Sequence, residues 1–265
     1  MKNVLLLVHD DAGQEARLQA ALDLTRALEG HLRCIDVAAL PAIVGDYYSG
    51  AADAMLLADE RERESANKKT VTARLEHEDV AWDWADVTGS LAESVVDAAA
   101  LADVIVINRK LDAFPYPDMR DIASRILTHA RKPVLAVPDS LERLALDRAL
   151  IAWDGQASSA ATMRACVPIL SLAREVEIFM ARDGGERTEP TEAAEYLSRH
   201  NIHASVRIID DGLHAADKLI AEEAARWRAD YVLMGAYSHG RLMESFGGVT
   251  KRMLDKAKLP LLLGH

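Results

Sequence analysis

The 265-residue sequence lacks the features that mark several large classes of protein. Basic residues are not in excess, because 31 lysines and arginines stand against 42 aspartates and glutamates and leave a formal net charge of −11. A protein that binds nucleic acid presents a basic face to the phosphates, so we expect no nucleic-acid partner. No stretch approaches the roughly 18 apolar residues of a membrane span, so we expect no membrane partner either.

Signatures of catalysis and of metal sites are also missing. The sequence contains no G-x-S-x-G nucleophile elbow, no G-x-x-x-x-G-K-[S/T] loop and no H-E-x-x-H pair. His9-Asp10-Asp11 carries groups that metals bind, but no further ligands follow at a suitable spacing, so we expect a turn there. We therefore name no catalytic residue and no metal ligand, and we expect no enzyme.

Cysteine is scarce, since only Cys34 and Cys166 occur. Both lie in apolar, periodic stretches, so we expect two buried thiols and not a redox or metal-binding pair. Met1-Lys2-Asn3 leads directly into a strand-like run without the apolar segment and cleavage site of a secretion signal. The expected location is the cytoplasm.

What the sequence does contain is an alternation of short apolar runs with longer stretches of helical period, the pattern of βα units around a parallel sheet. The predicted strands are Val4–Val8, His31–Val37, Ala81–Val87, Val104–Ile107 and Val134–Val137, then Ala149–Trp153, Val176–Met180, Ala204–Ile209, Tyr231–Met234 and Leu261–Leu263. The predicted helices are Gln14–Leu28, Asp53–Glu76, Leu91–Ala100 and Met119–Ala130, then Ser158–Ala173, Glu189–His200, His214–Arg228 and Val249–Ala257. The charge run Asp59–Glu64 predicts a solvated helix face with local ion pairs, and a partner-binding surface is the alternative.

Two distant stretches of the chain are nearly the same. Ala102–Asn108 aligns with Ala229–Gly235, and Ala130–Leu135 aligns with Ala257–Leu262. Both alignments have the same offset of 127 positions, since 103 matches 230 and 133 matches 260. We infer two domains, 1–140 and 147–265, joined by the charged linker Asp139–Asp147. Because the linker is short, we expect the domains to pack against each other.

The two copies differ in the loop that follows the matched strand. In the second copy, Gly235–Thr250 contains four glycines, whereas Asn108–Pro117 in the first copy contains none. Glycine amides and a helix N-terminus can surround an anion, so the second loop is expected to bind phosphate, with Ser238 and His239 as side-chain donors. The alternative is that these are ordinary strand-exit and helix-entry glycines. A glycine needed only for folding should occur in both copies, which favours the phosphate interpretation.

The unit from Val232 to Leu262 resembles the C-terminal signature of the universal stress protein family. Nucleotide-binding members of that family carry G-x-x-G, nine further residues, and then G-[S/T]. Gly235 and Gly248 fit the first and third positions with the spacing kept. Ser238 stands where the second glycine belongs, and Val249 stands where the serine or threonine belongs. The resemblance covers both halves of the chain, but the motif is confined to the second.

The resemblance implies that the second domain binds an adenine nucleotide, ATP or AMP with Mg²⁺, as a regulatory ligand. Asp154 would contact the adenine, although Asp154-Gly155 is equally a turn that starts a helix. The residues that would line the ribose and phosphates are Gly235, Ser238, Gly240, Gly248, Val249 and Thr250. The matching position in the first domain is His9 or Asp10, and no nucleotide is expected there. Slow hydrolysis of bound ATP is the most activity that we expect.

By the same resemblance, the fold is α/β, with two tandem Rossmann-like domains that each hold a five-stranded parallel sheet of order 3-2-1-4-5 between helices. The domains should pack as an intramolecular pseudo-dimer, partly through their fifth strands, and a further homodimer is left open. The implied function is a cytoplasmic stress response with an unknown protein partner. The alternative is that Ser238 and Val249 mark a lost site, in a protein that serves as an interaction scaffold or binds another small ligand.

Overall fold

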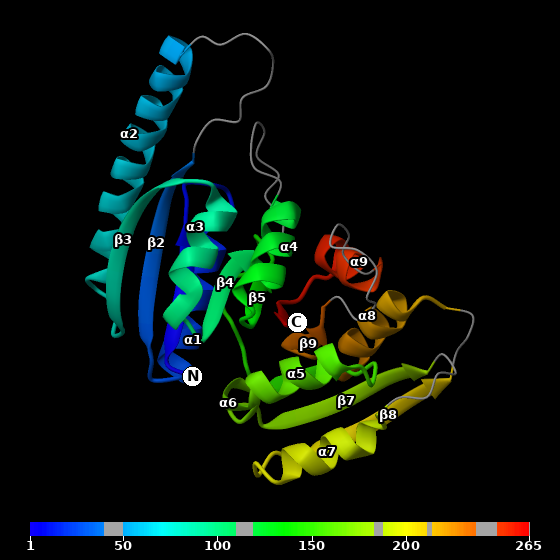
Figure 1. Cartoon of the computed structure of the whole chain (residues 1–265). Helices are drawn as coiled ribbons and strands as arrows, with labels where there is room; N and C mark the ends of the chain where they lie inside the picture. Colours follow the sequence, from blue (N-terminus) through cyan, green and yellow to red (C-terminus); the bar gives the residue numbers. More distant parts are fainter. Residues whose placement is uncertain (40–49, 110–118, 183–187, 211–213, 237–247, 265) are drawn as a thin grey trace.

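The computed structural model describes residues 1–39, 50–109, 119–182, 188–210, 214–236 and 248–264. Within them, ten strands form a single sheet in the order β3-β2-β1-β4-β5-β10-β9-β6-β7-β8 (Figure 1). The strands are β1 (Asn3–Val8), β2 (His31–Ala39), β3 (Ala81–Gly89), β4 (Val104–Asn108), β5 (Val134–Val137), β6 (Arg148–Ala152), β7 (Glu175–Arg182), β8 (Ala204–Asp210), β9 (Tyr231–Gly235) and β10 (Leu261–Gly264). Each predicted strand is present, with ends that differ by at most two residues.

Each half of the sheet has the predicted order 3-2-1-4-5. Neighbouring strands are parallel within β1–β5 and within β6–β10. The halves meet where β5 and β10 pair antiparallel, with Leu135 opposite Leu262. An antiparallel pairing between equivalent strands is what a two-fold relation between the halves produces. The predicted joining through the fifth strands is therefore confirmed.

Helices cover both faces of the sheet, and their apolar residues belong to two separate cores. The first face carries α1 (Gln14–Ala27), α2 (Gly50–Leu75), α5 (Ala157–Ala165), α6 (Val167–Leu170) and α7 (Pro190–Ser198). The second face carries α3 (Leu91–Ala98) with the short 3₁₀ helix η1 (Ala99–Leu101), α4 (Met119–Ala130), α8 (Ala216–Trp227) and α9 (Gly248–Lys256).

This double covering explains why the strands are apolar without interruption. Successive side chains of a strand point to opposite faces. In β1, Val4, Leu6 and Val8 therefore join the first core, while Leu5 and Leu7 join the second. The two cysteines are buried free thiols, as expected.

One predicted helix is wrong. Ser158–Ala173 is not continuous but is divided into α5 and α6 at Cys166. Pro168 lies in the first turn of α6, where the amide that proline lacks would have no intrahelical partner. Inside a continuous helix the same proline would remove a hydrogen bond and clash with the preceding turn, so the helix ends before it.

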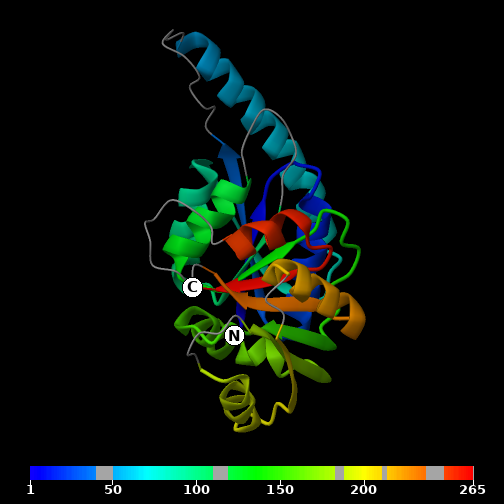
Figure 2. The same ribbon diagram turned by 90° about the vertical axis from the view of Figure 1, so that its right-hand side faces the viewer.

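The predicted solvated face of α2 is only partly confirmed. The helix projects beyond the ends of β2 and β3 (Figures 1 and 2), and Asp59 and Glu62 are exposed. Glu64, however, has a side chain that is only 4 % exposed and lies against the residues that follow β1. The charge run therefore combines a solvated face with a buried carboxylate.

Candidate functional site

The predicted nucleotide site lies at the carboxyl edge of the second half of the sheet. Strands β6 and β9 are neighbours, with Ala152 beside Met234, so Asp154 and Gly235 follow from adjacent strand ends. Open α/β sheets bind ligands at this edge. Ser238 and Gly240 lie outside the described residues.

Asp154 forms the turn that leads into α5. Its Oδ1 accepts a hydrogen bond from the amide of Gln156 at 3.0 Å and another from the hydroxyl of Ser159 at 2.6 Å. Gly155 has a φ of 69°, a left-handed conformation that glycine adopts without a Cβ penalty. The turn expected from the residues alone is therefore present. It fixes the carboxylate at the strand end where the resemblance places adenine contact.

The packing of β9 against the start of α5 requires a glycine at position 235, whether or not a ligand binds there. A Cβ at this position would lie 2.5 Å from the backbone nitrogen of Ser159, closer than real Cβ contacts occur. The start of α5 therefore touches the end of β9 backbone to backbone, and only glycine fits there. This contact gives weight to the strand-exit interpretation of Gly235 without excluding a nearby phosphate.

The three predicted residues at the start of α9 differ in what they present. Gly248 is exposed, and a Cβ built there would meet only the far end of the Arg252 side chain. Val249 is partly buried and packs on the second core, while Thr250 is only 4 % exposed. The first amides of a helix have no intrahelical acceptors, so this terminus can offer backbone donors to an anion.

The strand register identifies the matching residues of the first half. Val4 pairs with Val104 as Ala149 pairs with Tyr231, and Val104 matches Tyr231 in the internal repeat. His9 therefore matches Asp154, which settles the choice between His9 and Asp10.

The strand end of the first half is filled by a buried ion-pair network. Arg17 is fully buried, and its guanidinium donates to Asp11 Oδ2 at 2.7 Å and to the carbonyl oxygens of Leu7 and His9 at 3.0 Å. It also donates to Asn108 Oδ1, which occupies the position of Gly235. With two carbonyls, a carboxylate and an amide oxygen around it, this guanidinium is committed to protein acceptors.

Asn108 extends the network to the end of the first half. Its Nδ2 donates to Asp139 Oδ1 at 2.8 Å. Burial raises the pKa of Asp139, and its hydrogen bond to Asn108 only partly opposes that effect. Arg17 balances the charge of Asp11, and Asp139 adds a further carboxyl group, so the guanidinium of Arg17 is not available to an anionic ligand here.

Two residues that sequence reasoning missed lie beside His9. Glu60 and Glu64 reach it from α2, and Glu64 Oε1 is 2.8 Å from His9 Nδ1. Burial lowers the pKa of His9, but the Glu64 carboxylate outweighs burial, and the net pKa is raised. Burial, followed by the charge of Glu64, raises the pKa of Asp36 in β2 to about 7. The spacing of Glu60 and Glu64 places both on one helix face, but only the packing of α2 determines that this face meets His9.

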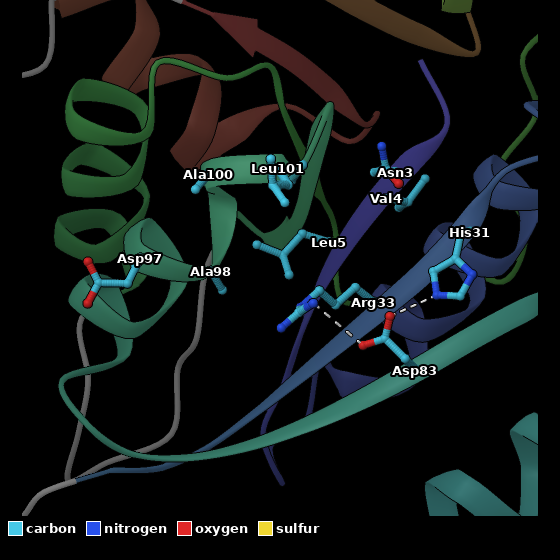
Figure 3. Close-up of a pocket in the computed structure, with 11 residues that line it drawn as sticks. Asn3, Val4, Leu5, His31, Arg33, Asp83, Asp97, Ala98, Ala100 and Leu101 are labelled. Atoms are coloured by element: carbon cyan, nitrogen blue, oxygen red, sulfur yellow. Dashed lines mark hydrogen bonds and ion pairs between the residues drawn. The ribbon is translucent and has the colours of Figure 1, made fainter.

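A cavity of about 320 Å³ opens at the opposite, amino edge of the sheet (Figure 3). Its lining includes Asn3 of β1 and Leu101 of η1. His31 Nε2 lies 2.8 Å from Asp83 Oδ2 on the adjacent strand, as the dashed line shows. Because ligands of such sheets bind at the carboxyl edge, this hollow is separate from the candidate site.

Comparisons with known proteins give matches in structure alone. No family model and no curated protein matches the chain. A universal stress protein from Archaeoglobus fulgidus DSM 4304 matches with a TM-score of 0.77 and 14 % identity, over 99 % of this chain and 95 % of that one. A candidate universal stress protein from Pseudomonas aeruginosa UCBPP-PA14 matches with a TM-score of 0.58 and 16 % identity, over 100 % and 93 %.

The same fold occurs in a different setting. The cytoplasmic domain of a prokaryotic cation chloride cotransporter matches with a TM-score of 0.51 and 11 % identity, over 99 % of this chain and 94 % of that one. In the described part of this chain, no helix combines the length and apolar character needed to cross a bilayer. At identities this low, the structural matches establish the fold alone, and the function has to be argued from the residues of the site. The chain has the fold of the universal stress proteins along its whole length.

Proposed function

We propose that this protein is a universal stress protein of the cytoplasm that binds an adenine nucleotide, ATP or AMP, in its second half as a regulatory ligand. The observation that carries the proposal is the contrast between two matched strand ends. Arg17, Asp11 and Asn108 fill the end of the first half with a buried ion-pair network. The strand register, continued with the same spacing into the helix that follows, gives Thr162, Gln156 and Gly235 as their counterparts in the second half.

These substitutions change what the strand end can accept. In the first half, the Arg17 guanidinium donates to protein acceptors, and the carboxyl groups of Asp11 and Asp139 lie nearby. The second half has neutral or small residues at the same three places, next to the start of α9. Phosphate groups are stabilised by backbone amides and by a helix N-terminus, and they are repelled by carboxylates. The second half is therefore the one suited to a nucleotide.

Each residue then has a distinct role. The carboxylate of Asp154 accepts a hydrogen bond from the adenine amino group, and the turn through Gln156 and Ser159 holds it in place. Gly248 leaves the first amides of α9 uncovered for a phosphate. Because Val249 packs on the core, it contributes its amide and not its side chain. Ser238 and Gly240 complete the phosphate loop in this proposal.

Nucleotide binding would act through a shift in population. A ligand that contacts both Asp154 and α9 stabilises the conformation in which these elements are closest. That conformation would expose or cover a surface for a protein partner. No catalytic residue is needed for such a role, and none is assigned.

Thermal unfolding of the full chain with ATP, AMP and Mg²⁺ tests the proposal. A ligand at 100 times its dissociation constant adds about 2.7 kcal/mol to the free energy of unfolding. For a protein of this size, 1 kcal/mol raises Tm by about 2–4 °C, so the expected rise is about 5–10 °C. We expect the rise in the wild type and its loss in Gly248→Trp, a position where a Cβ would meet only the end of the Arg252 side chain.

The outcome also decides between the two interpretations of the site. If no nucleotide raises the Tm of the wild type, the glycine loop is architectural and the scaffold alternative is correct. If Gly248→Trp keeps the full rise, a nucleotide binds elsewhere on the chain.

A further inference from the structure

We propose that His9, Glu60 and Glu64 form a binding site for one divalent transition-metal ion, of which Zn²⁺ is the best fit. The site lies at the carboxyl edge of the first half, where the nucleotide-binding role is lost. It is independent of the proposed nucleotide site, which lies in the second half.

The geometry suits a small ion. His9 Nδ1 lies 2.8 Å from Glu64 Oε1 and 3.8 Å from Glu60 Oε1. All three ligand atoms lie within 4.8 Å of one another. Two ligands about 2.1 Å from a tetrahedral zinc ion are about 3.4 Å apart, a separation between the two measured from His9. Water would take the remaining position.

The ligand atoms are buried and lack aligned partners. The side chain of His9 is 6 % exposed, yet its Nδ1 has no hydrogen-bond partner among the described residues. Glu60 Oε1 is also buried and has no hydrogen-bond partner among the described residues. His9 Nδ1 and Glu64 Oε1 are close enough for an ion pair, and a metal ion bound between them and Glu60 Oε1 would take the place of the ring proton. Three ligand atoms that converge on one point are arranged as metal ligands are.

Neighbouring residues hold the carboxylates in place. The amide of Asp10 donates to Glu64 Oε1 at 3.1 Å, and Asn67 Nδ2 donates to Glu64 Oε2 at 3.2 Å. Asn67 is fixed in turn by two reciprocal hydrogen bonds of 2.7 Å with Gln14. Arg63 Nη2 donates to Glu60 Oε2 at 2.6 Å, so the other carboxylate oxygen, Oε1, faces His9. Such outer contacts orient the ligands of metal sites.

The surroundings carry negative charge and offer access. Asp36 is buried beside Glu64, and its Oδ1 also lacks a hydrogen-bond partner in the described structure. Glu64 and Asp36 both line a cavity of about 360 Å³ that α2 forms with the ends of β2 and β3. The nearby cations Arg63 and Lys68 are paired with Glu60 and Asp86. Arg61 also lines the cavity, where it donates to Thr88, and an ion entering through the cavity would meet the carboxyl groups of Glu64 and Asp36.

The donor set selects the class of ion. Imidazole binds zinc and other late transition metals, whereas Mg²⁺ and Ca²⁺ prefer sites built from oxygen alone. One histidine with two carboxylates is therefore a site for Zn²⁺ before Mg²⁺. The ion would occupy Nδ1 of neutral His9, and the proton of the ring would reside on Nε2.

Equilibrium dialysis of the chelator-treated full chain against Zn²⁺, with metal analysis, tests the proposal. The wild type should retain one zinc ion more per chain than His9→Asn and Glu60→Gln. Glu60→Gln guards against misfolding, because glutamine keeps the size of the side chain and an acceptor oxygen for Arg63. Glu62→Gln is the matched control: it removes an exposed carboxylate of the same helix and should keep the wild-type zinc content.

Two further measurements sharpen the result. Asn67→Ala should weaken zinc affinity about 10–100-fold, since it removes a contact that orients Glu64. Excess Mg²⁺ should not displace the zinc. Equal zinc content in the wild type, His9→Asn and Glu60→Gln would overturn the proposal, because the ion would then be held elsewhere and the His9–Glu64 contact would be an ion pair only.

Discussion

Gly13 packs directly against the side chain of Asn108, and a Cβ built on Gly13 would overlap Asn108 Nδ2. In the second half, Ser158 takes the place of Gly13 and Gly235 takes the place of Asn108. A Cβ on Gly235 would lie 2.9 Å from Ser158 Oγ. Each half therefore has one glycine at this contact between helix and strand, but on opposite sides. The expectation that a structural glycine should recur at the same position is wrong here. The contact needs one glycine, but that glycine can lie on the helix side or on the strand side.

This exchange predicts coupling between the two positions of the first half. Gly13→Ser alone should lower the free energy of unfolding by about 1–3 kcal/mol, because a Cβ overlaps Asn108. Asn108→Gly alone should also destabilise, since it removes an acceptor of the buried Arg17. The double variant recreates the pair of the second half and should lose less than the sum of the two. Urea denaturation of the four proteins measures the coupling, and additivity within about 0.5 kcal/mol would contradict it.

Gly235 and Gly248 should respond differently to alanine. Gly235→Ala forces a Cβ against the backbone of Ser159, which cannot turn aside as a side chain can, so we expect a loss of about 1–3 kcal/mol in the free energy of unfolding. Gly248→Ala meets only the end of Arg252 and should change stability by less than about 0.5 kcal/mol. Urea denaturation of both variants separates the two roles. A Gly235→Ala protein as stable as Gly248→Ala would refute the backbone contact.

The pH dependence of stability should depend on Glu177. Its side chain is 7 % exposed, and burial, followed by the carboxylate of Glu223, raises its pKa to about 7 from 4.5. A raised carboxyl pKa means that the folded state binds the proton more tightly than the unfolded chain. The contribution to stability is therefore complete below about pH 4.5 and is lost as the pH rises to about 7. Glu177→Gln, which resembles the protonated form, should gain stability relative to the wild type over that interval.

Chemical denaturation at several pH values from about 5 to about 8 measures this difference. Glu222→Gln on α8 is the control, because its carboxylate is 60 % exposed and should leave the pH profile unchanged. A stability difference between Glu177→Gln and the wild type that stays constant with pH would show that Glu177 does not titrate in this range.

Much of the fold could be predicted because its cause lies in local pattern. Uninterrupted apolar runs such as Val104–Ile107 indicate strands that are covered on both faces, and the alternation with helices indicates a parallel sheet. The break between α5 and α6 was also available in the sequence, since Pro168 stands in the predicted helix. The order of the strands and their joining through β5 and β10 came from the family resemblance and not from pattern.

The site was harder to predict, because it depends on contacts between distant residues. Arg17 has nothing in its sequence surroundings to distinguish it from an exposed arginine of a helix, yet it is fully buried among acceptors from β1 and β4. Likewise, the approach of Glu64 to His9 depends on how α2 packs. The positions of Asp154 and Gly235 were predictable, since the ends of adjacent parallel strands must share an edge.

Calorimetric titration of the full chain with ATP measures whether the second half binds a nucleotide. The account predicts one ATP per chain, and at least about tenfold weaker binding by Asp154→Asn, which is about 1.4 kcal/mol. Asparagine keeps an acceptor oxygen for Gln156 and Ser159, so the turn is retained. The negative charge that accepts the hydrogen bond from the adenine amino group is removed. Asp10→Asn, at the matching strand end of the first half, should bind as the wild type does. Equal affinity of Asp154→Asn and the wild type would contradict the account.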